Sequence, residues 1–145
     1  MKKRSTARKV AVQMLYLKDL NPDAHPDSIR ATIVEELSEE ELQRFAWKLF
    51  SGVMENRAEL DEKIVQIAQN WSLSRMAPTD RNVLRLGAFE LLHSDTHYRI
   101  VIDEAVELAR LFGNKQSGQF VNGILDKLIP FEKRDTAPPE TSEEE

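Results

Sequence analysis

The 145-residue sequence has no cysteine and only five glycines. The absence of cysteine excludes disulfide bonds, thiolate zinc sites and a cysteine nucleophile, and it fits a reducing cytoplasmic compartment. The low glycine content and the 31% share of charged residues favour long helices over a sheet with many tight turns. We therefore expect an all-α protein.

Long apolar runs are missing as well. No stretch approaches the roughly 20 apolar residues that span a bilayer, and no continuous apolar segment follows the basic amino terminus as it would in a signal peptide. The sequence therefore predicts a soluble protein located in the cytoplasm.

Motifs that mark several enzyme classes are also absent. The sequence has no glycine-rich phosphate loop, no dinucleotide-binding fingerprint and no glycine-flanked nucleophilic serine. Asp103 and Glu104 are adjacent, but neighbours in a helix point about 100° apart and do not face one substrate. His93 and His97 could share a metal ion only on one helix, and the residues between them predict a helix end. We expect no catalysis, cofactor or metal.

What the sequence does contain is a polarised charge. Six of the 20 basic residues lie in the first 18 positions, which contain no acidic residue. Positions 19–145 contain the other 14 basic residues and all 25 acidic residues, so they carry a formal charge of −11. A compact positive segment on a negative protein attracts a polyanion to one face. The six residues are Lys2, Lys3, Arg4, Arg8, Lys9 and Lys18.

Apolar residues at helical spacing, with proline and glycine stops, predict seven helices. They cover approximately residues 4–20, 27–37, 38–55, 60–71, 79–93, 100–112 and 117–129. Ser38 with Glu41 is a candidate capping box for the third helix, and Ser117 is a candidate N-cap for the last. The helix of residues 79–93 is apolar on most sides and should be central. Trp71 belongs to the apolar face of the fourth helix.

The predicted domain organisation is one helical domain, residues 1–131, with a subdomain boundary near residue 56. Residues 132–145 are rich in Pro, Thr, Ser and Glu and contain no large apolar residue. Such a segment cannot offset its ordering entropy by burial, so we predict a disordered acidic tail.

The helical periodicity of the first helix assigns the basic residues to particular faces. At 100° per residue, four residues fall opposite its apolar stripe: Lys2, Lys9, Gln13 and Tyr16. Arg4 and Arg8 stack one turn apart on another flank. An exposed Tyr16 beside Lys9 and these arginines supplies charge for a phosphate backbone and a ring for a base, the two requirements of single-stranded nucleic acid binding. A solvated, frayed terminus is the alternative.

A second candidate site lies at the entry to the last helix, residues 116–120. Phe120 falls on the shoulder of the apolar stripe, beside Gln116, Gly123 and Lys127, so one face of its ring is open for stacking. Free N–H groups at the helix start could meet a phosphate. The alternative is that Phe120 only covers the edge of the core.

Four separated blocks of the sequence resemble the NusB family of transcription antitermination factors. They are Ala7-Arg8 with residues 11–16 (AVQMLY), residues 80–86 (DRNVLRL) with 89–91 (FEL), residues 106–113 (VELARLFG), and residues 120–126 (FVNGILD). The blocks follow the family's order and agree with it in both residue and spacing.

The resemblance implies an all-α fold of about seven helices in two subdomains and a function without catalysis. Members bind boxA single-stranded RNA of ribosomal RNA leaders together with NusE, a small-subunit ribosomal protein. Other Nus factors and RNA polymerase join indirectly. The resemblance leaves open whether the free protein forms a homodimer.

The resemblance also assigns site residues. The RNA contacts fall on Arg4, Arg8, Tyr16, Gln116, Ser117, Gln119 and Phe120, and a NusE contact falls on Asp80. Ser5 and Thr6 stand where some members have arginine, and Gln116 with Gln119 replaces charged residues.

Two other functions fit the sequence. One is a helical interaction module whose acidic surface binds a basic protein, with RNA binding incidental. The other is the RNA-binding appendage of a methyltransferase, against which the length argues, because no residues remain for a cofactor-binding domain.

Overall fold

The computed structural model describes residues 2–69 and 71–134, and these ranges contain helices and connections but no β-strand. The predicted all-α class is confirmed. Of the predicted tail, residues 135–145 lie outside the described ranges. No helix within the described ranges combines the length and apolar content needed to cross a bilayer.

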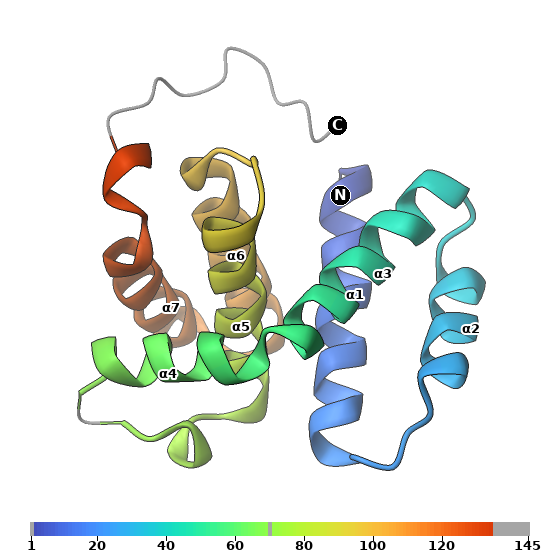
Figure 1. Ribbon diagram of the computed structural model, residues 1–145, viewed down its shortest axis with the longest axis horizontal. Coiled ribbons are helices and arrows are strands. Elements are labelled where there is room, and N and C mark those ends of the chain that lie inside the picture. The colour runs from blue at the N-terminus through green and yellow to red at the C-terminus, as the bar shows by residue number, and fades with distance from the viewer. Residues whose placement is uncertain (1, 70, 135–145) are drawn as a thin grey trace.

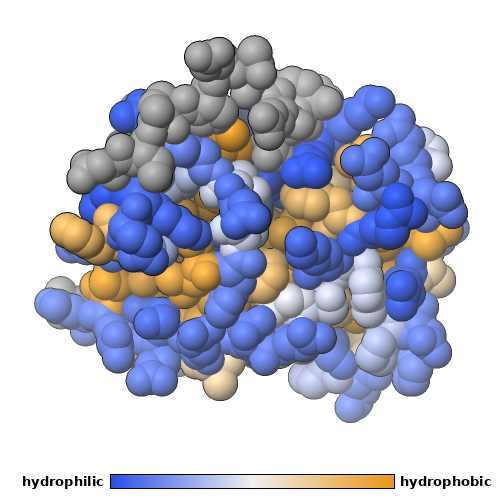
Figure 2. Space-filling view, turned by 45° about the horizontal axis from the view of Figure 1, so that its top comes forward, coloured by the Kyte–Doolittle hydropathy of each residue, from blue (hydrophilic) through white to orange (hydrophobic). Residues whose placement is uncertain are grey.

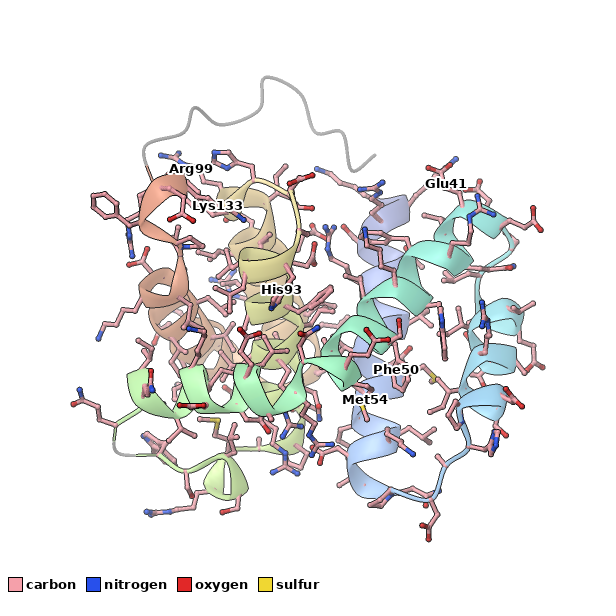
Figure 3. All side chains as sticks on the ribbon, in the orientation of Figure 1. Glu41, Phe50, Met54, His93, Arg99 and Lys133 are labelled. Carbon is pink, nitrogen blue, oxygen red and sulfur yellow. The ribbon has the colours of Figure 1, made fainter. Side chains whose placement is uncertain are left out.

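The described ranges form seven α-helices and two short 3-10 helices (Figure 1). These are α1 (Lys3–Leu20), α2 (Pro26–Glu36), α3 (Glu40–Glu55), α4 (Arg57–Ile67), η1 (Leu73–Arg75), α5 (Pro78–His93), α6 (Tyr98–Phe112), α7 (Lys115–Leu128) and η2 (Phe131–Lys133). The first three helices lie together on one side in Figure 1, and α4 to α7 lie on the other. Phe50 and Met54 of α3 lie beside α1, on which α3 packs (Figure 3).

Helix α5 is the centre of the core, as its apolar sequence predicts. Every residue from 82 to 91 is buried, and α5 contacts α1, α3, α4, α6 and α7. A helix surrounded on all sides brings the two groups of helices into one core. Its polar residues Asn82, Arg85 and Glu90 are buried with it, and each has a hydrogen-bond partner.

Contacts at Gly52 and at Asp19 are two of the junctions that hold α1–α3 against α4–α7. At the first, a Cβ at Gly52 of α3 would overlap the ring of Phe89, so only glycine lets α5 approach this closely. The Phe89 ring stacks on His93 at a centroid distance of 5.7 Å, and His93 Nε2 lies 2.7 Å from Glu59 Oε1 of α4. His93 projects from α5 toward α4 in Figure 3. A chain of side-chain contacts thus joins α3, α5 and α4.

The second junction is an ion cluster around Asp19, near the end of α1. Its Oδ2 accepts hydrogen bonds from Arg81 Nε at 2.6 Å, Asn82 Nδ2 at 3.0 Å and Arg85 Nη1 at 3.3 Å. Arg85 also binds Asp61 of α4 through Nε at 2.8 Å and Nη2 at 3.1 Å. Burial raises the pKa of Asp19, but the hydrogen bonds and the neighbouring guanidinium charges outweigh it and lower the pKa below its usual value.

Several predicted helix ends differ from the structure. Helix α3 begins at Glu40 with Glu39 as its N-cap, so the Ser38–Glu41 capping box is wrong. Helix α6 begins at Tyr98, because His97 Nδ1 accepts the Arg99 N–H and caps it two residues earlier than expected. Propensity alone places helix ends only to within a few residues, since the capping geometry decides them.

The described chain stays ordered past the predicted start of the tail. Lys133 Nζ donates to the carbonyl oxygens of Leu91 at 2.9 Å and Ser94 at 3.1 Å, and Tyr98 Oη donates to that of Arg134 at 2.9 Å. Figure 3 shows Lys133 beside the ends of α5 and α6. These carbonyls at the end of α5 need a donor, and Lys133 supplies it.

Candidate nucleic-acid interface

The outward face of α1 carries a polar stripe with one aromatic ring. Lys2, Gln13 and Tyr16 are exposed and Lys9 is half-buried. Lys2, Lys9 and Tyr16 are spaced seven residues apart, so they form one row along the helix, and 37% of Tyr16 is exposed. The predicted face is therefore present, with an accessible ring at one end of a basic row.

Arg8 lies on the other side of α1, inside the protein. Only 1% of its surface is exposed, and it forms a bidentate ion pair with Glu90 of α5 through Nε at 2.7 Å and Nη2 at 2.8 Å. Its Nη1 lies 3.5 Å from Glu104 of α6. The resemblance assigned Arg8 to the RNA contacts, but its side chain is buried, and Glu90 compensates its charge in the interior.

Three other basic residues near the amino terminus also have partners within the protein. The Arg4 guanidinium lies 4.5 Å above the Phe45 ring of α3. Lys3 pairs with Glu39 at 3.0 Å, and Lys18 donates to two carbonyl oxygens just beyond the end of α1. Arg4 is half-buried, whereas Arg8, the other arginine of the segment, is buried. Much of the positive charge near the amino terminus therefore interacts with other groups of the protein itself.

The second predicted site is at the start of α7. The N-cap is Asn114, whose Oδ1 accepts the Ser117 N–H at 2.9 Å, and Ser117 occupies the N3 position of the capping box. The prediction of Ser117 as N-cap is wrong, although its side chain completes the cap. Asn114 and Ser117 are both good capping residues, and the turn after α6 selects Asn114.

The four predicted residues of α7 differ in exposure. Gln116 and Gln119 are exposed, Ser117 is buried and Phe120 is half-buried against the edge of the core. The Phe120 ring meets the Trp71 ring edge to face, with centroids 6.2 Å apart at 71°. Phe120 thus has both a packing role and an accessible part.

Asp80 lies next to this site. Its Oδ2 accepts a hydrogen bond from Ser117 Oγ at 3.4 Å, while its Oδ1 is buried without a hydrogen-bond partner in the described structure. Burial raises the pKa of Asp80 against the opposing effect of the Ser117 hydroxyl. The carboxylate lines a cavity of about 350 Å³ together with Trp71, Arg75 and Phe120. The predicted partner residue and the predicted α7 site therefore share one cavity.

Trp71 and Arg75 are residues of this cavity that the sequence did not reveal. Helix α4 ends at Ile67, so Trp71 lies beyond it with 48% of its surface exposed. The Arg75 guanidinium lies 5.7 Å above the Trp71 ring. The apolar spacing assigned Trp71 to the core, because periodicity cannot show that a helix has already ended.

Two further hollows lie along α6, one beside the start of α1 and one beside α7. One, of about 500 Å³, includes Lys2, Ser5 and Glu107, and the other, of about 510 Å³, includes Glu107, Gln119 and Asn122. Glu107 borders both hollows. Figure 2 shows one face of the molecule as mostly hydrophilic, with apolar side chains between the polar groups. The two hollows therefore bring Lys2 and Gln119 to opposite sides of Glu107.

The histidines considered for a metal have other contacts. His93 stacks on Phe89 and contacts Glu59, and His97 caps α6. Within residues 2–69 and 71–134, no group of three or more His, Asp or Glu residues could hold a metal ion.

Known proteins similar to this chain agree with the fold and with the sequence blocks. The model of the NusB family matches residues 5–130. A transcription antitermination protein NusB of Anaeromyxobacter dehalogenans is 43% identical over 127 residues, covering 87% of this chain and 89% of that protein.

Solved structures give the same result. T. maritima NusB is 33% identical, with a TM-score of 0.79 over 90% of this chain and 95% of that one. A structure of antitermination factors NusB and NusE in complex with dsRNA has a chain that is 29% identical, with a TM-score of 0.78 over 88% and 96%. The chain described here belongs to the NusB family.

Proposed function

We propose that this protein is an RNA-binding transcription antitermination factor that binds boxA RNA of ribosomal RNA leaders together with NusE. It acts in the cytoplasm, where the complex joins other Nus factors and RNA polymerase. The function requires binding and positioning, without a chemical step. The observation that carries the proposal is an aromatic ring at each of two sites, the exposed Tyr16 in a basic row on α1 and the half-buried Phe120 beside exposed amides on α7.

At the α1 site, Lys2 and Lys9 neutralise phosphates and Tyr16 stacks a base. Arg4 adds charge from the partly exposed side of the helix. Arg8 holds α1 in place through Glu90, so it supports the site without touching RNA. The row from Lys2 to Tyr16 is about 21 Å long, enough to follow several nucleotides.

At the α7 site, Phe120 stacks a second base, and Gln116 and Gln119 offer amide groups to base edges. Single-stranded RNA exposes these edges, which is how most sequence-specific RNA recognition works. Ser117 acts from beneath by closing the cap of α7. Glu107 borders both hollows along α6. Its negative charge repels RNA phosphates, so the backbone of the strand is expected to pass to one side of it.

The NusE surface of this proposal includes Asp80 and its cavity. Asp80 lines this cavity, and its carboxylate gives the cavity a negative charge that suits a basic side chain from a ribosomal protein. Because Phe120 lines the same cavity, NusE and RNA would meet there and stabilise each other's binding. In the free protein, self-association through this surface would compete with NusE.

The test measures RNA affinity of the full chain with NusE by fluorescence anisotropy, using a single-stranded boxA oligonucleotide and its duplex. We expect Tyr16→Ala and Phe120→Ala each to lose about 1–3 kcal/mol of binding free energy to the single strand, because each removes one stacking ring. Phe131→Ala is the matched control, since that ring is 87% exposed and outside the proposed sites. Unchanged affinity of both variants would show that the sites are wrong.

The second candidate function is a helical module that binds a basic protein through its acidic surface, with RNA binding incidental. The charge of −11 on positions 19–145 favours it. The two functions differ in their dependence on α1. If substitution of Lys2 and Lys9 by Gln leaves RNA retention with NusE unchanged, the second function is favoured.

A further inference from the structure

Four of the five glycines have a packing reason inside the protein. A Cβ at Gly52 would overlap Phe89, one at Gly87 would overlap Leu125, one at Gly113 would overlap the Ser117 hydroxyl, and one at Gly118 would crowd Arg110. None of the described glycines has a positive φ. Close approach of neighbouring elements therefore explains these four positions.

Gly123 has no such reason. A Cβ there would have no atom of the described chain within 4 Å, beyond its own helix backbone and its two sequence neighbours. The residue is exposed in the ninth of the 14 positions of α7. Glycine in a helix interior is less stable than alanine, so this position weakens α7 without improving the packing.

The residues next to Gly123 on the surface of α7 indicate which ligand could occupy the open space above it. Gln116, Phe120, Gly123 and Lys127 follow one another at four-, three- and four-residue steps, so they form one row about 16 Å long on α7. The row presents an amide, a half-buried ring, a gap and an exposed ammonium group. From Phe120 to Lys127 the row rises only about 10 Å, a length that the base, the sugar and the phosphate of one nucleotide can span.

We propose that Gly123 determines how closely RNA approaches α7. The base stacks on Phe120, the sugar lies against the bare helix backbone at Gly123, and the following phosphate reaches Lys127. This inference rests on the proposed function and adds a position and a direction for the strand. A side chain at residue 123 would lift the nucleotide away from the helix and weaken the stacking.

The test compares Gly123→Ala and Gly123→Leu with the parent, using the single-stranded boxA oligonucleotide with NusE. We expect the melting temperature of both variants to rise by about 2–4 °C, because helix propensity improves. We expect RNA affinity to fall about threefold for alanine and about tenfold or more for leucine. Ala31→Leu is the matched control, an exposed position on α2 whose substitution should leave affinity unchanged.

Three outcomes separate this inference from the proposed function. If Gly123→Leu binds RNA within twofold of the parent while Phe120→Ala binds weakly, only the role of Gly123 is overturned. If Tyr16→Ala and Phe120→Ala bind as tightly as the parent, the stacking sites of the proposed function are wrong, and the role of Gly123 falls with them. If Gly123→Leu weakens NusE binding measured without RNA, the gap accommodates the protein partner, and the RNA contact is overturned.

Discussion

The two faces of α1 use the same kind of charge for different purposes. Arg8 on the inner face is buried and ion-paired to Glu90, whereas Lys9 on the outer face is half-buried and belongs to the row that ends at Tyr16. The two residues are adjacent in sequence. The number of basic residues in α1 therefore does not show which of them stabilise the fold and which are available to bind RNA. That depends on the face of the helix on which each side chain lies.

The comparison also extends along the helix. On the inner face, Arg8 reaches α5 and α6, and Asp19 reaches Arg81 and Arg85 of α5. Within the described residues, Lys9 and Tyr16 on the outer face form no ion pair with a distant helix. Substitutions on the inner face should thus change folding, and substitutions on the outer face should change binding.

The largest expected effect is on the inner face at Arg8. Arg8→Met leaves Glu90 buried without its partner, so we expect a loss of about 3–5 kcal/mol in the free energy of unfolding. Urea denaturation followed by circular dichroism at pH 7 measures it. Lys9→Met is the control and should change stability by less than about 0.5 kcal/mol.

A double variant sharpens this prediction. Arg8→Met with Glu90→Leu removes both charges and should recover part of the loss, because the uncompensated carboxylate is gone. Equal unfolding midpoints for Arg8→Met and Lys9→Met would contradict the division of α1 into two faces.

The next largest effect is at Asp19. Asp19→Asn leaves Arg81 without its carboxylate partner, and we expect a loss of about 2–3 kcal/mol at pH 7. The folded-state pKa of Asp19 lies below its unfolded value, so its contribution is present above the unfolded pKa and is lost as the pH falls through the folded pKa. The difference between parent and variant should therefore be constant near neutrality and shrink below about pH 4.

The measurement is urea denaturation from pH 7 down to pH 3. Asp23→Asn is the control, because Asp23 is exposed in the connection that follows α1, and its effect should stay below about 0.5 kcal/mol. A stability difference for Asp19→Asn that grows toward acid pH would refute the assigned direction.

The smallest effect is on the outer face and concerns RNA binding. Lys9→Gln should leave the unfolding midpoint unchanged and reduce the slope of log K against log salt by about 0.7, the value for one phosphate contact on a single strand. Lys48→Gln on the exposed side of α3 is the control. Identical salt slopes for the parent and Lys9→Gln would remove Lys9 from the interface.

The sequence predicted the helices and the outer face of α1 well, because helical periodicity directly reports which side of an element is apolar. The central position of α5 followed from the same signal. The subdomain boundary near residue 56 stays a prediction: Asn56 separates α3 from α4, while α1 packs on α5 across that division.

The errors have a common physical origin. Arg8 lies within the apolar arc of α1, but its partner Glu90 is 82 residues away, and no local pattern records that pairing. Asn114 and Ser117 have similar capping preferences, so only the turn geometry chooses between them. Trp71 continues the spacing of α4 although the helix has ended. Long-range contacts and helix ends decided each of these cases.

The ring of Phe89, inserted where Gly52 leaves room, has a consequence for the ligand. It joins α3 to α5, and the His93–Glu59 contact extends the connection to α4, so the helix group carrying Tyr16 is fixed against the group carrying Phe120. The distance between the two rings is therefore a property of the core, and flexible loops do not set it. An RNA strand that stacks on both rings must therefore place its two stacked bases at the fixed separation of Tyr16 and Phe120.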